Sequence, residues 1–452
     1  MYIPSRRKFL SISCRSLASI GTAGIISRFG MMNAMAQNSS NYRALVCVFL
    51  LGGNDGNNTV VPFNTPSQSY QNYAAVRQGL ALPQGSLLQI PAQGGAATYG
   101  LHPRLTEIQQ LYLQKKSALV INVGMLVKPI TRAQYLAQSV PVPQNLFSHS
   151  DQQDQWQTSY TNSFSSTGWA GRAADAVQSM NAPSVFPPVI SVVGSSLFCE
   201  GRSTHPTTVT PGVPLGLSGF GYGTQARLLG FQQLLTFDNG LALVQASNGI
   251  TTRGISDANT LNGALSAAPA LATQFPSTQL GQQLQQVAKI IQVRSGLGMN
   301  RQIFFCALNG FDTHSNQLAT QDALLAQVSP AIAAFYAATQ ELGVDQQVTT
   351  FTESEFARTA QPSSGGGSDH AWGGHQIVVG GAVAGGDMYG QYPTIALNGP
   401  DDISGRGVWI PTTAVDQYGA TLASWFGVSA ANLPTVFPNL ANFPVQNLGF
   451  LG

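Results

Sequence analysis

The chain has 452 residues, of which only 9% are charged, and its formal net charge is +2. Charged residues make up about 25% of a typical soluble protein, so Gln, Asn, Ser and Thr supply much of the polar surface here. The small net charge and the lack of a Lys/Arg cluster after residue 36 argue against nucleic-acid binding. The length is sufficient for one large domain or two.

Residues 1–36 have the pattern of a twin-arginine export signal. Ser5–Leu10 has the sequence S-R-R-K-F-L, and a weakly apolar stretch then ends on the A-x-A cleavage signal Ala34–Ala36. A membrane anchor is the alternative, but Arg28 interrupts the stretch, which contains no run of about 18 uncharged residues. We therefore expect export through the twin-arginine translocase. The mature chain would be periplasmic or secreted, with no membrane span.

From residue 37 onward, short apolar runs alternate with segments of helical period. Strands are predicted at residues 44–51, 118–123, 188–193, 302–308 and 348–351, and helices at 103–116, 168–180, 279–295, 319–342 and 416–426. This alternation predicts a doubly wound α/β domain over 37–452, with a mostly parallel central sheet flanked by helices. Residues 195–270 fit the pattern poorly. They are predicted to be an irregular insertion, either a cap or an interface, with one helix near 224–236.

Polar clusters follow the predicted strands, where an open α/β sheet binds its ligands. They occupy residues 52–59, 147–151, 310–314, 353–359 and 369–375, and they hold four of the six histidines. The candidate metal ligands in them are Asp55, Asp312, His314, Glu355, Asp369, His370 and His375. Mixed carboxylate and imidazole donors predict one or two divalent ions, with Zn or Mn favoured over Mg or Ca.

Each of these residues also has a structural explanation. Asp55 fits a turn, and Glu355 fits the negative charge that stabilises a helix start. Ser148 fits an N-cap for the polar helix that follows it. The joint placement of five clusters at strand exits or in loops on one presumed edge of the sheet favours a shared site over five separate explanations.

The clusters carry a family resemblance. The motifs at residues 52–56 (G-G-N-D-G), 310–314 (G-F-D-T-H), 354–359 (S-E-F-A-R-T), 369–373 (D-H-A-W-G) and 380–390 resemble the family catalogued as domain of unknown function 1501. That family is similar to the alkaline phosphatase and sulfatase superfamily. The resemblance implies an alkaline phosphatase-like sheet, a two-metal-type site and a hydroxyl nucleophile at a helix start. It implies no particular substrate.

The resemblance also implies roles for single residues. Asp55 resembles the first-strand metal ligand, the pair Asp312 and His314 resembles the ligands of one metal, and His370, or else His375, resembles the late histidine ligand. Glu355 stands where the superfamily usually has an Asp-His pair. The nucleophile is expected to be Ser148, with Ser150 second and Thr59 third. His149 lies beside this nucleophile, and Arg358 or His375 is expected to steady a bound anion.

Two departures from the superfamily pattern indicate a changed metal site. Phe356 follows Glu355 where a histidine is expected, and the spacing from Asp312 to His314 is shorter than usual. Either departure points to a single metal ion, a different metal or lost catalysis.

Two functional hypotheses follow from the sequence. The first is an exported metal-dependent hydrolase of phosphate or sulfate monoesters that uses a serine nucleophile and takes a small anionic ester as substrate. The second is a non-catalytic periplasmic binding or assembly protein that keeps the superfamily scaffold. A transferase or isomerase acting on a phosphorylated substrate is a third use of the same site.

Overall fold

The computed structural model describes residues 41–452, apart from 163, 218, 221–222 and 239. The predicted export signal lies outside the described residues. Arg43–Gly452 form one compact unit. Among the described helices, none combines the length and the apolar character that crossing a membrane requires.

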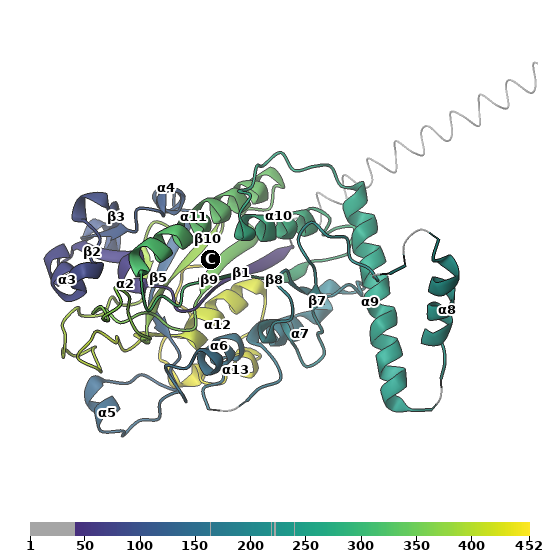
Figure 1. The fold of residues 1–452 in the computed structure, drawn as a ribbon. Helices are drawn as coiled ribbons and strands as arrows, with labels where there is room; N and C mark the ends of the chain where they lie inside the picture. The colour runs from purple at the N-terminus through teal and green to yellow at the C-terminus, as the bar shows by residue number, and fades with distance from the viewer. Residues whose placement is uncertain (1–40, 163, 218, 221–222, 239) are drawn as a thin grey trace, which may run out of the picture. The chain divides into compact units, whose positions relative to one another are not determined.

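A nine-stranded sheet lies at the centre, in the order β11-β5-β10-β9-β1-β8-β6-β7, with β12 beside β5 (Figure 1). Its strands are β1 (Arg43–Leu51), β5 (Ser117–Gly124), β6 (Val189–Ser191), β7 (Thr207–Thr208), β8 (Arg301–Asn309), β9 (Val348–Glu353), β10 (Gly374–Gly380), β11 (Met388–Tyr389) and β12 (Thr413–Ala414). All pairings are parallel except those of β10, which is antiparallel to both neighbours. The mostly parallel sheet predicted from the sequence is confirmed.

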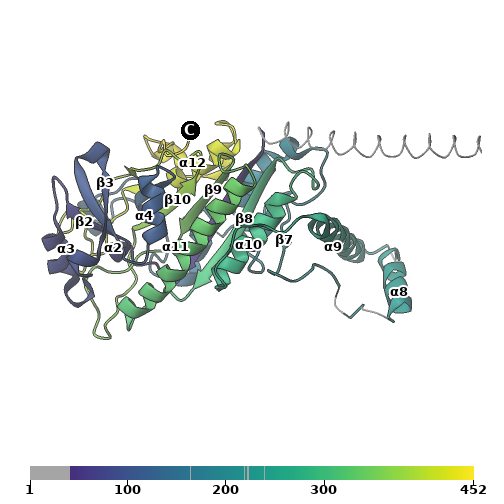
Figure 2. The ribbon, with the colours of Figure 1, turned by 90° about the horizontal axis from the view of Figure 1, so that it is seen from above.

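The central strands are buried, and β1 and β8 are nearly continuous apolar runs, because both faces of the sheet are covered. In β1, Ala44 through Leu50 are buried. On one face lie α4 (Thr106–Leu113), α10 (Gln279–Gln292) and α11 (Gln317–Glu341), and on the other lie α6 (His149–Thr158), α7 (Trp169–Ala176), α12 (Val415–Phe426) and α13 (Leu433–Val436) (Figures 1 and 2). Phe49, Phe305, Phe351 and Trp169 are part of the core on the second face. Helices on both faces make the domain doubly wound, as predicted.

A small antiparallel sheet follows the exit of β1. It consists of β2 (Val60–Asn64), β4 (Ala97–Leu101) and β3 (Leu88–Ala92) in that order, accompanied by the helices α2 (Gly56–Thr59) and α3 (Tyr70–Arg77). A further short helix, α5 (Arg132–Leu136), precedes α6. The small sheet was not predicted. It matters for the site because it places α3 beside the strand exits.

The insertion contains two helices, α8 (Gln225–Leu235) and α9 (Ala242–Ala267), where the sequence predicts only the first. The 26-residue α9 contains Gly249, Gly254 and Gly263, and glycine costs about 1 kcal/mol relative to alanine inside a helix, which hides the helix in the sequence. In both views, α8 and α9 lie beyond β7, at the opposite end of the sheet from α2 (Figures 1 and 2). This placement does not favour a cap over the β1 exit.

Candidate metal centre

Three histidines surround the carboxylate of Asp312. The Asp312 Oδ2 atom lies 3.3 Å from Nε2 of His149, which opens α6. The Oδ1 atom lies 3.1 Å from Nε2 of His314 and 3.4 Å from Nε2 of His370. Asp312 and His314 come from the β8 exit, His149 from the start of α6 and His370 from the loop before β10. The chain brings together four of the predicted site residues.

The loop after β1 packs closely against the loop that carries Asp312. Gly52 has φ +118°, and a Cβ atom on it would lie 2.2 Å from the backbone nitrogen of Asp312. Only glycine tolerates both the backbone angle and the close approach. The G-G motif thus sets the distance between the β1 exit and the loop that carries Asp312.

His149 is held in the orientation of a metal ligand. Its Nδ1 lies 2.9 Å from Oε1 of Glu355, a fully buried carboxylate. This partner places a proton on Nδ1, and it raises the pKa of His149 through that hydrogen bond. The opposite nitrogen, Nε2, is buried, faces Asp312 and makes no hydrogen bond within the described chain. A carboxylate that orients an imidazole in this way is typical of histidine metal ligands.

His370 and His314 show the same orientation. The Nδ1 of His370 lies 2.7 Å from the carbonyl oxygen of Phe147, which places the proton on Nδ1 and leaves the Nε2 lone pair free. The Nδ1 of His314 lies 3.4 Å from Asp369. The two Nε2 atoms are 3.0 Å apart. Two lone pairs at this distance repel unless a proton or a cation lies between them.

Arg358 neutralises Asp312 from the protein interior. Its guanidinium donates to Oδ1 of Asp312 and to the carbonyl oxygens of Gly52, Gly53 and Ser368, and it is fully buried. Burial raises the pKa of Asp312, but the hydrogen bond and charge of Arg358, with the nearby histidines, outweigh it and hold the pKa at about 2. Arg358 therefore fixes Asp312 in its ionised form. It is not placed to steady a substrate anion at the surface.

Phe356 forms an apolar wall of the cluster. Its buried ring stacks on His370 at a centroid distance of 4.4 Å and lies 4.8 Å from His149. Burial lowers the pKa of His370. At the position where the superfamily pattern expects a histidine, this chain has a side chain that excludes water and offers no donor.

Glu355 and Asp369 contact the histidines on the side of each ring that points away from Asp312. The Oε1 atom of Glu355 accepts hydrogen bonds from the Gly52 N–H and from Gln153 in addition to its contact with His149. Asp369 pairs with Arg406 and with His314. Both acids were predicted as metal ligands. The structure places both against imidazole Nδ1 atoms.

Asp55 and His375 do not join the cluster. Oδ2 of Asp55 lies 2.5 Å from Nη2 of Arg77 on α3 and accepts from Gln317 at 2.7 Å, and its side chain is 1% exposed. His375, on β10, accepts from the N–H of Asn122 at 3.1 Å, and burial lowers its pKa to about 3. The antiparallel β10 was not predicted, and it is this strand that holds His375 in the interior.

The three candidate nucleophiles differ in availability. Ser148 is the N-cap of α6, and its Oγ donates to Oδ2 of Asp151 at 2.5 Å and lies 3.2 Å from Oγ of Ser150. Thr59 is 1% exposed, and its hydroxyl donates to the carbonyl oxygen of Asp55. The serines adjoin His149 in the chain, whereas Thr59 is buried among the partners of Asp55.

Arg77, Arg406 and Gln153 were not among the predicted site residues. Gln153 follows His149 by four residues, the spacing that puts two side chains on one face of a helix, and this spacing is a usable signal. Nothing in the sequence connects Arg77 with Asp55, because the contact depends on the small β2-β4-β3 sheet.

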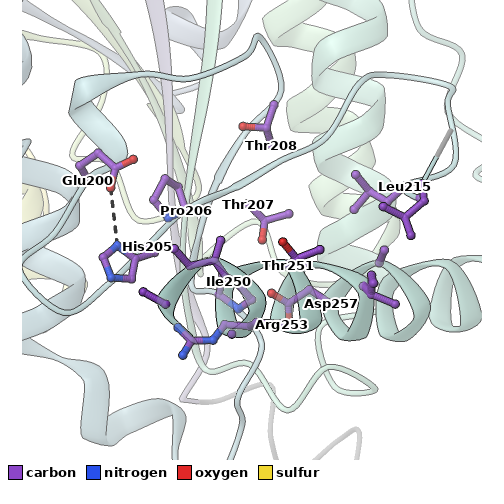
Figure 3. Close-up of a pocket in the computed structure, with 18 residues that line it drawn as sticks. Glu200, His205, Pro206, Thr207, Thr208, Leu215, Ile250, Thr251, Arg253 and Asp257 are labelled. Atoms are coloured by element: carbon purple, nitrogen blue, oxygen red, sulfur yellow. Dashed lines mark ion pairs between the residues drawn. The ribbon is translucent and has the colours of Figure 1, made fainter. Parts of the chain in front are cut away.

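Two of the cavities in the described structure bear on where a ligand could bind. The larger, of about 830 Å³, is formed by α9 and residues 200–217, and contains an ion pair between Glu200 and His205 at 3.8 Å (Figure 3). It includes none of the predicted site residues. The second, of about 570 Å³, lies at the carboxyl ends of β1, β6 and β8 and includes Gln153. The second is linked to the histidine cluster through Gln153, which donates to Glu355.

Comparison with known proteins identifies a family. The profile described as "Protein of unknown function (DUF1501)" matches residues 42–404. No curated protein matches the chain. Similar solved structures include Ps i-CgsB in complex with k-i-k-neocarrahexaose, at 9% identity and a TM-score of 0.35, over 88% of this chain and 76% of that chain.

Two other similar structures are the PsFucS1 sulfatase from Pseudoalteromonas sp. and a mutant of alkaline phosphatase PafA. The first has 9% identity and a TM-score of 0.31, covering 93% of this chain and 72% of that one. The second has 11% identity and a TM-score of 0.26, covering 72% and 64%. At these scores the description of the fold rests on the sheet itself. The family match covers most of the chain, and the chain belongs to the DUF1501 family.

Proposed function

We propose that this chain is an exported hydrolase that uses a divalent metal ion to cleave phosphate or sulfate monoesters. The observation that carries the proposal is the orientation of the three imidazoles around Asp312. All three Nδ1 atoms have oxygen partners within the chain, so that all three Nε2 atoms face one carboxylate.

The donor set fits one ion. His149, Asp312 and His370 offer ligand atoms within 4.8 Å of one another, and His314 adjoins them as a fourth donor. Three nitrogens and one oxygen suit Zn or Mn better than Mg or Ca. Asp55 is paired with Arg77, and Phe356 replaces an expected histidine, so the proposal is for one metal ion rather than two.

A metal ion held here would act as a Lewis acid that polarises an ester oxygen and stabilises developing negative charge. The residues of the chain supply the remaining functions. Ser148 is the proposed nucleophile, and Asp151 accepts the hydrogen bond of its hydroxyl and is placed to accept its proton. Glu355 orients His149, Arg358 keeps Asp312 ionised, and Phe356 keeps water from one side.

The second candidate is a non-catalytic binding or assembly protein. One observation favours it: buried guanidinium groups already neutralise both strand-exit aspartates, Arg77 at Asp55 and Arg358 at Asp312. A scaffold with internal cations needs no metal for the stability of these carboxylates.

Metal content and turnover together distinguish the two candidates. The exported, mature chain would be analysed for bound metal by mass spectrometry and assayed with aryl phosphates and aryl sulfates. We expect about one metal ion per chain, which Asp312→Asn loses together with activity. Ser148→Ala should keep the metal and lose at least about 1,000-fold in rate, a loss typical of a missing nucleophile.

The matched control is Asp322→Asn, which removes an acid that pairs with Arg104 at the surface of α11. It should change neither metal content nor turnover. Turnover that survives both Asp312→Asn and Ser148→Ala would overturn the hydrolase proposal. A folded chain that binds no metal and turns over no ester would support the non-catalytic candidate.

A further inference from the structure

The cleft beside the histidine cluster has the position of a ligand site. Its volume of about 570 Å³ lies within the range of about 300–1,000 Å³ that is typical of small-molecule pockets. It opens at the carboxyl ends of β1 and β8, marked by Leu51 and Asn309, between α6 and the start of α10. Open α/β sheets bind ligands at this edge.

The lining is polar but almost without charge. Asp154 is the single charged residue among the residues described as lining the cleft. The other polar lining residues are Gln153, Gln157, Ser195, Ser196, Thr210, Gln279, Gln282, Gln283 and Asn309. Leu51, Val193 and Phe305 add apolar surface. This composition excludes the dense positive charge that a polyanion requires.

Part of this polar lining is already fixed by the chain. Gln283 uses both ends of its amide on the backbone of Ala307, each at 3.0 Å. Gln157 accepts from the hydroxyl of Ser196 at 2.9 Å and from a backbone N–H at 3.1 Å. These bonds hold two of the walls in one geometry, which lowers the entropic cost of binding.

Other polar groups remain available. The side chains of Ser195, Thr210, Gln279 and Asn309 are exposed and make no hydrogen bond within the described part of the chain. They present two hydroxyls and two primary amides, each of which can donate and accept. A ligand with many hydroxyl groups can form more hydrogen bonds with these side chains than a charged or an apolar ligand can.

Gln153 connects the cleft to the cluster. It lines the cleft and donates to Oε1 of Glu355 at 2.9 Å, and Glu355 in turn holds Nδ1 of His149. A ligand in the cleft therefore lies one side chain away from the residues that orient the proposed metal ligand.

We propose that this cleft binds an uncharged glycan, so that the ester hydrolysed at the histidine cluster is carried on a carbohydrate. The amides and hydroxyls would pair with sugar hydroxyls, and the partly exposed Leu51 and Val193 would face the C–H surfaces of the rings. The assignment of the ester rests on the proposed function. The assignment of the glycan rests on the cleft alone.

Direct binding tests the glycan independently of catalysis. The mature chain would be titrated calorimetrically with neutral tetrasaccharides of glucose, galactose, mannose and xylose, with and without EDTA. We expect at least one to bind, with an affinity that EDTA leaves unchanged. Gln279→Leu and Asn309→Leu should each weaken that binding by about tenfold, because each leaves a sugar hydroxyl without a partner.

The matched control is Gln340→Leu, which makes the same change at an exposed position of α11, away from the cleft. It should leave the affinity unchanged. Failure of all four tetrasaccharides to bind, or equal weakening by Gln340→Leu, would overturn the glycan site. Glycan binding that persists in a chain without metal or turnover would refute only the hydrolase, and the glycan site would stand.

Discussion

Two aspartates at neighbouring strand exits show how similar sequence signals lead to different chemistry. Asp55 follows β1 and Asp312 follows β8, each in a loop with glycine. Both carboxylates pair with a buried arginine, Asp55 with Arg77 and Asp312 with Arg358. The side chain of Asp55 is only 1% exposed, whereas that of Asp312 is 46% exposed and is also surrounded by three imidazoles. The neighbouring imidazoles and the access of solvent, rather than the loop sequence, decide which carboxylate is able to bind a ligand.

The largest effect on stability is expected when the buried ion pair of Asp55 is removed. Arg77→Met leaves the Asp55 carboxylate buried without its cation, and should lower the free energy of unfolding by about 3–5 kcal/mol in chemical denaturation. Arg104→Met removes an exposed ion pair with Asp322 and is the control, with a much smaller expected loss because solvent screens this pair. Equal losses would mean that the buried pair has no special role.

A third aspartate, Asp416, is buried, and its raised pKa makes the stability of the chain depend on pH. Asp416 on α12 is fully buried with Oδ2 unpartnered, and burial raises its pKa to about 7 from 3.8. The folded state thus holds this proton up to about pH 7 and the unfolded state releases it near pH 4, so stability falls as the pH rises between them. Since one pKa unit corresponds to about 1.4 kcal/mol, Asp416→Asn should gain up to about 4 kcal/mol over the wild type across this window.

Denaturation curves of the wild type and Asp416→Asn at several pH values between 4 and 8 measure this gain. Asn keeps the hydrogen bond from the backbone N–H of Asn439, so the variant isolates the proton. Parallel pH profiles for the two proteins would contradict the raised pKa of Asp416.

The Asp312 side of the comparison is tested by metal affinity. Asp312→Asn removes the carboxylate that all three imidazoles face, and we expect it to weaken metal binding by at least about 100-fold, beyond the usual effect of an orienting residue. Competition with a chromophoric chelator measures this affinity. Unchanged affinity would place the metal ligands elsewhere.

The smallest effect is expected for Glu355, and it distinguishes a metal ligand from a residue that orients a metal ligand. Glu355→Gln keeps the shape of the side chain but removes the charge that orients His149, and should weaken metal binding by about 10- to 100-fold in the same competition assay. A loss as large as that of Asp312→Asn would make Glu355 a ligand, as the sequence first predicted.

Much of the fold was predictable because its signals are local. The runs at residues 44–51 in β1 and 303–308 in β8 are apolar without interruption, which favours a sheet covered on both faces. β10 escaped prediction because its short G-H-Q-I-V-V-G run begins with a polar pair and lies between glycine-rich loops. The helix α9 escaped because its glycines hide the helical period.

The site was predictable only as a set of candidates. The sequence predicted that Asp312, His149, His314 and His370 lie at one edge of the sheet. In the structure the three histidines contact Asp312 there. The roles of Asp55 and Glu355 were not accessible, since both depend on partners distant in the chain. Arg77 reaches Asp55 from α3, and His149 comes to Glu355 from α6.

The pairing order of the sheet has a consequence for the synthesis of the chain. β1 is the first strand made, but its hydrogen-bonded neighbours β8 and β9 follow only at Arg301–Asn309 and Val348–Glu353. Contacts between such distant segments slow folding, because the loops between them must close first. The ribosome must therefore synthesise the chain as far as β8 before this apolar strand has a partner. Until then β1 is exposed, and exposed apolar strands favour aggregation.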